Sequence, residues 1–306
     1  MKLGDLSQQE YLHRLAGEGL RLRTGPFVVR IRSDIDAVRQ GLRLLYEHNP
    51  LAADDGFADF HVAVRHGGVL RRWFRPQVRF EVDGVEPFLP LPANQALPML
   101  EWGMNWCITA YGHHQLVLHA AAVARGEHAL ILPAPPGSGK STLCAALVNR
   151  GWRLLSDELT LIDLASGTVH GLARPVNLKN DSIGIIKRFA PAAVFSAPAT
   201  DTAKGTVALM KAPTASVDQA TAGTLPKWIV LPRYTPGTSA RLKTMPSGAA
   251  FLAIADNAMN YHVLGRKGFE AVGRLIDRCS RHSFEYSELD EAVACLDLLA
   301  SGGVIG

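Results

Sequence analysis

The 306-residue sequence contains few cysteines and no cysteine-based motif. Its four cysteines, Cys107, Cys144, Cys279 and Cys295, are scattered, without a C-x-x-C pair or a histidine at metal-ligand spacing. This distribution excludes a zinc ribbon and a disulfide framework. Three of the four lie in apolar helical patterns, so we expect buried, reduced thiols.

Long apolar segments are also absent. The most apolar stretch, residues 116–132, is interrupted by charged residues and histidines, and a transmembrane helix needs about 20 mostly apolar residues. The first 19 residues lack the apolar region and the cleavage site of a signal peptide. We therefore expect a cytoplasmic protein without a membrane partner.

The chain also lacks a large excess of positive or negative charge. The chain has 32 Lys and Arg against 28 Asp and Glu, a net charge of +4. A nucleic-acid-binding protein normally shows a concentrated basic stripe, so we expect no nucleic-acid partner. Hydrophobic residues make up 47% and charged residues 20% of the chain, a balance typical of a folded globular protein.

The pattern of residues predicts two domains of different organisation. We expect an N-terminal α+β domain over residues 1–100 and a second domain over 101–306. In the first domain, alternation of apolar and polar residues predicts strands at 27–32, 61–65 and 78–82. Apolar residues at helical spacing predict a helix at 34–46. A proline-rich connector at 87–92 precedes a helix at 98–113, which we expect at the domain junction.

The second domain has the alternation of strands and helices expected of an α/β fold. Strands are predicted at 116–124, 129–133, 153–155, 159–164 and 228–232. Helices are predicted at 140–150, 247–259, 267–281 and 288–300.

A glycine-rich loop lies between the apolar strand at 129–133 and the helix at 140–150. It matches the phosphate-binding pattern G-x-x-x-x-G-K-[ST], except that Ala134 replaces the first glycine. Successive backbone N–H groups at a helix N-terminus bind phosphate oxygens, and glycines allow close approach. The predicted nucleotide-binding residues are Ala134, Pro135, Pro136, Gly137, Ser138, Gly139, Lys140, Ser141 and Thr142.

Two acidic residues, Asp157 and Glu158, end the short apolar strand that follows this helix. One carboxylate can hold Mg²⁺ together with the Ser141 hydroxyl, and the other can accept a proton from an incoming hydroxyl. The other interpretation of such a pair is a solvated strand end or a helix cap. Beside a phosphate loop we favour the catalytic interpretation.

Other candidate residues lie near the loop in sequence. His119 is in an apolar strand, where a histidine is either part of the core or a catalytic group. Arg174, Lys179 and Lys204 are in polar, turn-rich segments. Each can reach a transferring phosphoryl group, or belong to a solvated loop.

The stretch from His119 to Asp163 resembles the catalytic core of the HPr(Ser) kinase/phosphorylase family, with a histidine, the phosphate loop, a helix ending in Arg-Gly and an acidic pair in the same order. Over its whole length the chain is similar to the HPr kinase-related kinase A group, in residues 20–32, 54–60, 102–107 and 257–262. The resemblance implies a P-loop core with the fold of HPr kinase and phosphoenolpyruvate carboxykinase, and an assembly of several subunits.

The resemblance also implies a role for each matched residue. Asp157 would deprotonate a serine hydroxyl, Glu158 and Ser141 would hold Mg²⁺, Lys140 would clamp the phosphates of ATP, and His119 would lie beside the acceptor. The acceptor would be a protein or peptide, such as a small peptide-chaperone-like protein encoded nearby.

The chain also departs from the family. Glu158 stands where HPr kinases have a second Asp, and the downstream signature of the phosphorolytic back-reaction has no counterpart here. The N-terminal hundred residues also show no clear match to the regulatory domain of the family. We therefore expect a kinase without phosphorylase activity, acting on an acceptor other than HPr. A kinase for a small hydroxylated metabolite such as free serine, and an ATP-binding regulator without catalysis, are the alternatives.

Overall fold

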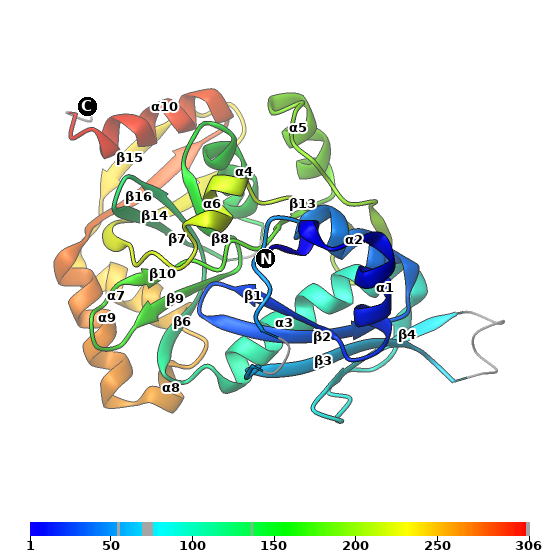
Figure 1. The fold of residues 1–306 in the computed structure, drawn as a ribbon. Coiled ribbons are helices and arrows are strands. Elements are labelled where there is room, and N and C mark those ends of the chain that lie inside the picture. Colours follow the sequence, from blue (N-terminus) through cyan, green and yellow to red (C-terminus); the bar gives the residue numbers. More distant parts are fainter. Residues whose placement is uncertain (54–55, 69–75, 136, 304–306) are drawn as a thin grey trace.

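The computed structural model describes residues 1–53, 56–68, 76–135 and 137–303, which form a mixed α/β protein with three sheets (Figure 1). None of the helices in these ranges combines the length and apolar character needed to cross a membrane.

The N-terminal sheet has five strands in the order β1-β2-β3-β4-β5. They are β1 (Leu20–Thr24), β2 (Phe27–Ser33), β3 (Phe60–His66), β4 (Gln77–Val82) and β5 (Leu91–Pro92). Strands β2 and β3 are parallel and connected through helix α2, whereas the other pairs are antiparallel. Every second side chain of β1 to β4 lies in the core, as the alternating sequence predicts.

Three helices complete this core on one face of the sheet. They are α1 (Gln8–Ala16), α2 (Asp36–Leu45) and α3 (Ala96–Tyr111), with short 3₁₀ turns η1 (Leu3–Asp5) and η3 (Ala93–Gln95). The amphipathic pattern of α2 predicts its position, because Val38, Leu42 and Leu45 are buried against the sheet.

The second sheet has the order β10-β9-β6-β7-β14-β16-β15, with β8 paired to β6. Its strands are β6 (Gln115–Arg125), β7 (His128–Pro133), β8 (Arg153–Ser156), β9 (Leu159–Asp163), β10 (Val169–His170), β14 (Leu225–Tyr234), β15 (Arg241–Thr244) and β16 (Ser280–Tyr286). Strands β7, β14 and β16 are parallel, so their carboxyl ends share one edge.

Helices cover both faces of this sheet (Figure 1). They are α4 (Lys140–Asn149) and α10 (Leu289–Ala300) on one face, and α7 (Ser247–Asp256), α8 (Tyr261–Leu264) and α9 (Arg266–Arg278) on the other. Leu130 and Leu132 of β7 belong to the first core and Ala129 and Ile131 to the second. Burial on both faces explains why residues 129–133 of β7 are all apolar.

A small antiparallel sheet with the order β11-β13-β12 adjoins these layers. Its elements are β11 (Val176–Lys179), β12 (Ala199–Thr202) and β13 (Gly205–Met210), accompanied by helices α5 (Asp181–Phe189) and α6 (Thr214–Asp218).

Most predicted elements are present within a few residues of their expected limits. The prediction of one helix over 267–281 is wrong at its end, because α9 stops at Arg278 and strand β16 begins at Ser280. The predicted domain boundary at residue 100 falls within α3. That helix packs on the N-terminal sheet, and the division into two domains stays a prediction.

Candidate active site

The glycine-rich loop joins the carboxyl end of β7 to the N-terminus of α4. Gly137 and Gly139 have positive φ angles of 85° and 88°, a conformation that favours glycine. The Tyr286 hydroxyl donates a hydrogen bond to the Gly139 carbonyl at 3.0 Å, and the Tyr234 amide donates to the Ser138 carbonyl at 3.0 Å. Strands β14 and β16 therefore fix the loop. Pro136, a predicted binding residue, lies outside the described residues.

The loop contains polar groups suited to an anion. No described side chain caps the N-terminus of α4, so the first N–H groups of the helix face the loop without a side-chain acceptor. The Ser138 hydroxyl is buried and has no hydrogen-bond partner among the described residues. Both features fit a bound phosphate, which supplies acceptor oxygens.

Lys140 is buried, with 7% of its surface exposed, and its Nζ lies 3.1 Å from Nε2 of His119 on β6. Burial lowers the pKa of Lys140, while Asp157 and Glu158 act in the opposite direction. Burial and the Lys140 charge together lower the pKa of His119 to about 4. At neutral pH the imidazole is uncharged, so its ring nitrogen accepts a hydrogen bond from the lysine.

Asp157 follows β8 directly and is 4% exposed. Its Oδ2 accepts a hydrogen bond from the backbone N–H of Asn177 at 2.9 Å. Its Oδ1 is buried and has no hydrogen-bond partner among the described residues. Burial, followed by the neighbouring Glu158 charge, raises the pKa of Asp157 to about 6. The Lys140 charge, the Asn177 backbone N–H and the Ser141 hydroxyl oppose this increase, so all three lie near enough to act on the carboxylate.

Glu158 is held by two side-chain amides. Asn105 Nδ2 on α3 donates to Oε2, and Asn177 Nδ2 donates to Oε1 at 3.3 Å. The Asn105 Oδ1 atom accepts a hydrogen bond from Arg174 Nη1 at 2.6 Å. Because a guanidinium only donates, this contact fixes the Asn105 amide with its N–H groups towards Glu158.

Arg174 belongs to this network rather than to a solvated loop. It is 6% exposed, and its Nη2 lies 2.7 Å from Oε2 of Glu101 on α3. Tyr46 donates a hydrogen bond to the other Glu101 oxygen at 2.6 Å. The loop interpretation of Arg174 is therefore wrong, and the guanidinium is directed to Glu101 and Asn105, where it positions Glu158.

The two lysines predicted near the site, Lys179 and Lys204, are close enough to His119 to change its pKa. Lys179 ends β11 and Lys204 lies in the turn between β12 and β13, and both charges lower the pKa of His119. The Lys204 ammonium lies 5.4 Å from the centre of the half-buried Trp102 ring on α3. The structure thus brings Lys140, Lys179 and Lys204 to the same region as the two carboxylates.

The oxygen atoms at this site fit a divalent cation bound together with a nucleotide. Asp157 Oδ1 and Asn177 Oδ1 are both buried without a partner among the described residues, and the Ser141 hydroxyl is beside Asp157. The described residues contain no group of three His, Cys, Asp or Glu side chains suited to holding a metal alone. Mg²⁺ commonly uses one or two carboxylates and completes its shell with phosphates and water.

A cavity of about 20 Å³ adjoins the acidic pair. It is lined by Asp157, Glu158, Asn105, Asn177 and Arg174, among other residues. The volume matches about one water molecule, and the polar lining supplies hydrogen-bond partners for it.

The sequence analysis missed Glu101, Asn105, Asn177 and Tyr286 as site residues. One signal was available: Glu101 and Asn105 are four residues apart, and so share one face of an otherwise apolar helix. Tyr286 offers no such signal, because its contact with Gly139 depends on the parallel pairing of β14 and β16.

Comparisons with known proteins find likenesses among solved structures, but none among family models or curated proteins. The chain matches no protein-family model and no curated protein. Among solved structures it is similar to the Hpr(Ser) kinase/phosphatase from Coxiella burnetii, with a TM-score of 0.27 and 12% sequence identity over 61% of this chain and 95% of that chain. A TM-score this low does not establish a common fold, so the function proposed for the chain rests on the residues of the site.

Proposed function

We propose that the chain is a Mg²⁺-dependent kinase that transfers the γ-phosphoryl group of ATP to a serine-type hydroxyl of a protein or peptide. The observation that supports this most directly is the convergence of Lys140, Ser141 and Asp157 at the glycine-rich loop. A phosphate-binding loop, a buried lysine and a carboxylate with a free oxygen are the groups that phosphoryl transfer requires.

The nucleotide would bind with its phosphates over the N-terminus of α4. The helix N–H groups and the Ser138 hydroxyl would donate hydrogen bonds, and Lys140 would exchange its contact with His119 for the β- and γ-phosphates. Ser141 and Glu158 would hold Mg²⁺, which neutralises the phosphate charge when bound, and Asp157 Oδ1 would stay available to the acceptor hydroxyl.

Asp157 would act as the base. Its Oδ1 has no hydrogen-bond partner among the described residues and can accept a proton. The pKa of about 6 leaves the carboxyl group ionised at neutral pH. As the acceptor oxygen bonds to the γ-phosphorus and the bond to the ADP oxygen breaks, the hydroxyl proton moves to Asp157. A general base of this kind contributes about 10²–10⁴-fold to the rate.

The proposal is tested by γ-phosphate transfer from labelled ATP to proteins encoded nearby. Asp157→Asn is expected to keep ATP affinity and to lose about 10²–10⁴-fold in turnover. Lys140→Ala is expected to weaken ATP binding itself, measured by calorimetry. The exposed Asp277→Asn and Lys267→Ala are the matched controls and should change neither quantity.

The alternatives give other results in the same assay. Transfer to free serine, with none to protein, would indicate a small-molecule kinase. ATP binding without transfer to any acceptor would overturn the kinase proposal in favour of a regulator. Cytoplasmic location and assembly into an oligomer stay predictions.

A further inference from the structure

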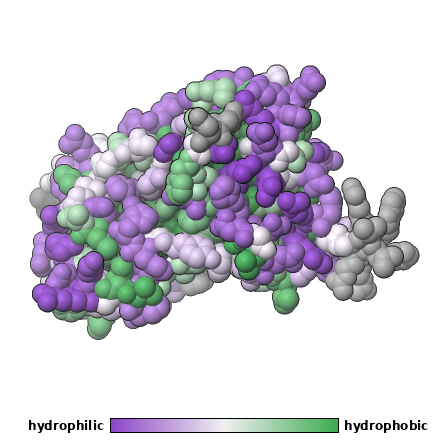
Figure 2. Space-filling view, turned by 60° about the horizontal axis from the view of Figure 1, so that its bottom comes forward, coloured by the Kyte–Doolittle hydropathy of each residue, from purple (hydrophilic) through white to green (hydrophobic). Residues whose placement is uncertain are grey.

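The outer face of the N-terminal sheet carries a concentration of arginines that the net charge of +4 does not reveal. Among its alternate, outward positions are six basic residues, which we call the basic face: Arg21, Arg30, Arg32, His61, Arg65 and Arg79. Helices α1, α2 and α3 belong to the core on the opposite face of the sheet. Figure 2, which brings the lower side of Figure 1 forward, shows a largely hydrophilic surface on this side of the molecule.

The strand register places like charges opposite one another. Arg21 pairs with Arg30 across β1 and β2, and Arg65 pairs with Arg79 across β3 and β4. Like charges directly opposite on a sheet destabilise it. A partner that brings negative charge to this face would relieve that repulsion.

Neighbouring acidic residues form ion pairs with only some of the arginines of the basic face. Arg65 lies 3.4 Å from Glu81, and Arg79 lies 3.2 Å from Glu86. Arg21, Arg30 and Arg32 form no ion pair with any described residue. Arg30 donates instead to the Glu18 carbonyl, and Arg21 Nε is buried without a hydrogen-bond partner among the described residues.

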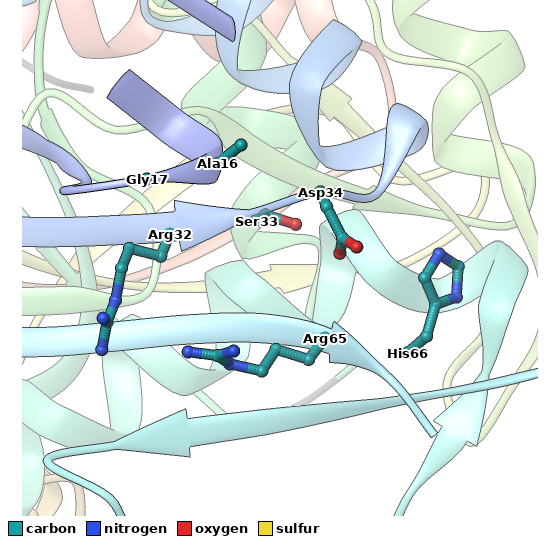
Figure 3. A pocket seen from close by; sticks show the side chains of 7 residues that line it. All are labelled: Ala16, Gly17, Arg32, Ser33, Asp34, Arg65 and His66. Carbon is teal, nitrogen blue, oxygen red and sulfur yellow. The ribbon is translucent and has the colours of Figure 1, made fainter. Parts of the chain in front are cut away.

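A surface pocket of about 460 Å³ adjoins the basic face at the carboxyl ends of β2 and β3. It is lined by Ala16, Gly17, Arg32, Ser33, Asp34, Arg65 and His66. Figure 3 shows the Arg65 side chain directed along β3 towards Arg32, and Asp34 facing His66. The two guanidinium groups are suited to carboxylates, which they bind in a bidentate manner.

The mixture of charges favours a polypeptide over a nucleic acid. Glu81, Glu86 and Asp34 are interspersed among the arginines and would repel a continuous phosphate backbone. The strand positions of the face carry no Phe, Tyr or Trp on which bases could stack. A protein surface with separate Asp and Glu residues can avoid the three acidic groups and still meet the arginines.

We propose that the basic face and its pocket are a docking surface for an acidic segment of a protein partner. Arg21, Arg30 and Arg32 provide the unpaired charge, and the pocket receives a carboxylate side chain between Arg32 and Arg65. This inference is independent of the proposed kinase activity, since none of these residues belongs to the active site.

The test measures binding of a fluorescent peptide rich in Asp and Glu by anisotropy at low salt. The variant Arg21→Gln/Arg30→Gln/Arg32→Gln is expected to bind about tenfold more weakly or worse, because it removes three charges that would pair with the peptide. The control Arg241→Gln/Arg266→Gln/Lys267→Gln removes the same charge from exposed positions on β15 and α9 and is expected to bind like the unchanged chain.

Equal losses in the two triple variants would overturn the proposal, because they would indicate a general effect of net charge. Tighter binding of single-stranded DNA, lost in the same triple variant, would also overturn it. Hydrogen exchange of the unchanged chain with the peptide is the second measurement, which does not depend on the variant folding. Protection confined to β1, β2 and the pocket supports the proposal, and protection elsewhere contradicts it.

Discussion

The carboxyl groups of Asp157 and Glu158 are adjacent in sequence but differ in their surroundings. Asp157 is buried, with one oxygen on a peptide N–H and the other without a partner among the described residues. Glu158 has a side-chain amide on each oxygen. Burial, followed by the neighbouring Glu158 charge, raises the pKa of Asp157, so its ionised form adds a cost to folding that a neutral Asp157 would avoid.

This cost predicts a pH dependence of stability. The folded-state pKa of Asp157 is about 6 against 3.8 in the unfolded chain, so the folded state binds more protons between these values. In the absence of Mg²⁺, the unchanged chain should therefore gain stability relative to Asp157→Asn as the pH falls from about 6 to about 4. Urea denaturation of both proteins at several pH values, with a chelator present, measures the difference.

His119 acts in the opposite direction over a similar range, because its pKa is lowered to about 4 from 6.5. It is present in both proteins, so the comparison isolates the carboxylate. A constant stability difference between pH 6 and 4 would show that Asp157 is not held with a raised pKa.

At the scale of elements, the glycine-rich loop before α4 requires a glycine at position 139. A Cβ on Gly139 would lie 2.5 Å from the Tyr286 hydroxyl oxygen, in a backbone conformation with a φ of 88°. We predict that Gly139→Ala lowers ATP affinity, because the loop must move from the position that β14 and β16 give it. Calorimetry with ATP measures the effect.

Gly126 is the matched control for this substitution. It also has a positive φ, 58°, but a Cβ there has nothing within 4 Å, and the residue lies in the turn between β6 and β7. Gly126→Ala should carry the backbone strain and leave ATP affinity unchanged. A comparable loss of affinity in both variants would contradict the role assigned to the Tyr286 contact.

Helix α3 contributes through the buried ion pair of Glu101 with Arg174. Glu101→Gln leaves the guanidinium without a counter-charge, and we predict a loss of about 3–5 kcal/mol in the free energy of unfolding. Glu101→Leu/Arg174→Met removes both charges and should lose less than the sum of its single variants. Additive losses in urea denaturation would show that the pair is not coupled.

The sequence was sufficient to predict the elements next to the phosphate loop and the residues on them. The apolar runs of β6, β7 and α4 predicted these elements, because the turn at residues 125–127 and the glycine-rich loop mark their limits. The sequence did not predict the end of α9, because no glycine or proline follows Arg278 to mark the end of the helix before Ser280. The amides around Glu158 could not be predicted, because Asn105 and Asn177 come from elements far apart in sequence.

At the scale of the whole molecule, the N-terminal core extends into the second predicted domain. Residues of β6 and β9 (Val117, Leu159 and Leu161) are buried in the same cluster as α2, α3 and the N-terminal sheet. Tyr46 adds polar contacts to Arg174 and Glu101 across the same boundary. Shared burial of this kind favours a single cooperative unit.

We therefore predict one unfolding transition. Trp106 packs against the N-terminal core and Trp152 lies in the core beneath α4, so variants that retain one or the other report on the two regions. Their fluorescence and the far-ultraviolet circular dichroism should change at the same urea concentration. Separate midpoints would instead show that the core around the N-terminal sheet and the core beneath α4 unfold independently.

The contact between Lys140 and the uncharged His119 has a consequence for covalent chemistry. A buried lysine with a lowered pKa has more of its amine in the unprotonated, nucleophilic form than an exposed lysine has. A phosphate-bearing aldehyde would be drawn to the loop by its anion and would form an imine with this amine in preference to surface lysines. If ATP binds as proposed, it would protect Lys140 from the aldehyde, so the same lysine would serve as a chemical reporter of whether the loop is filled.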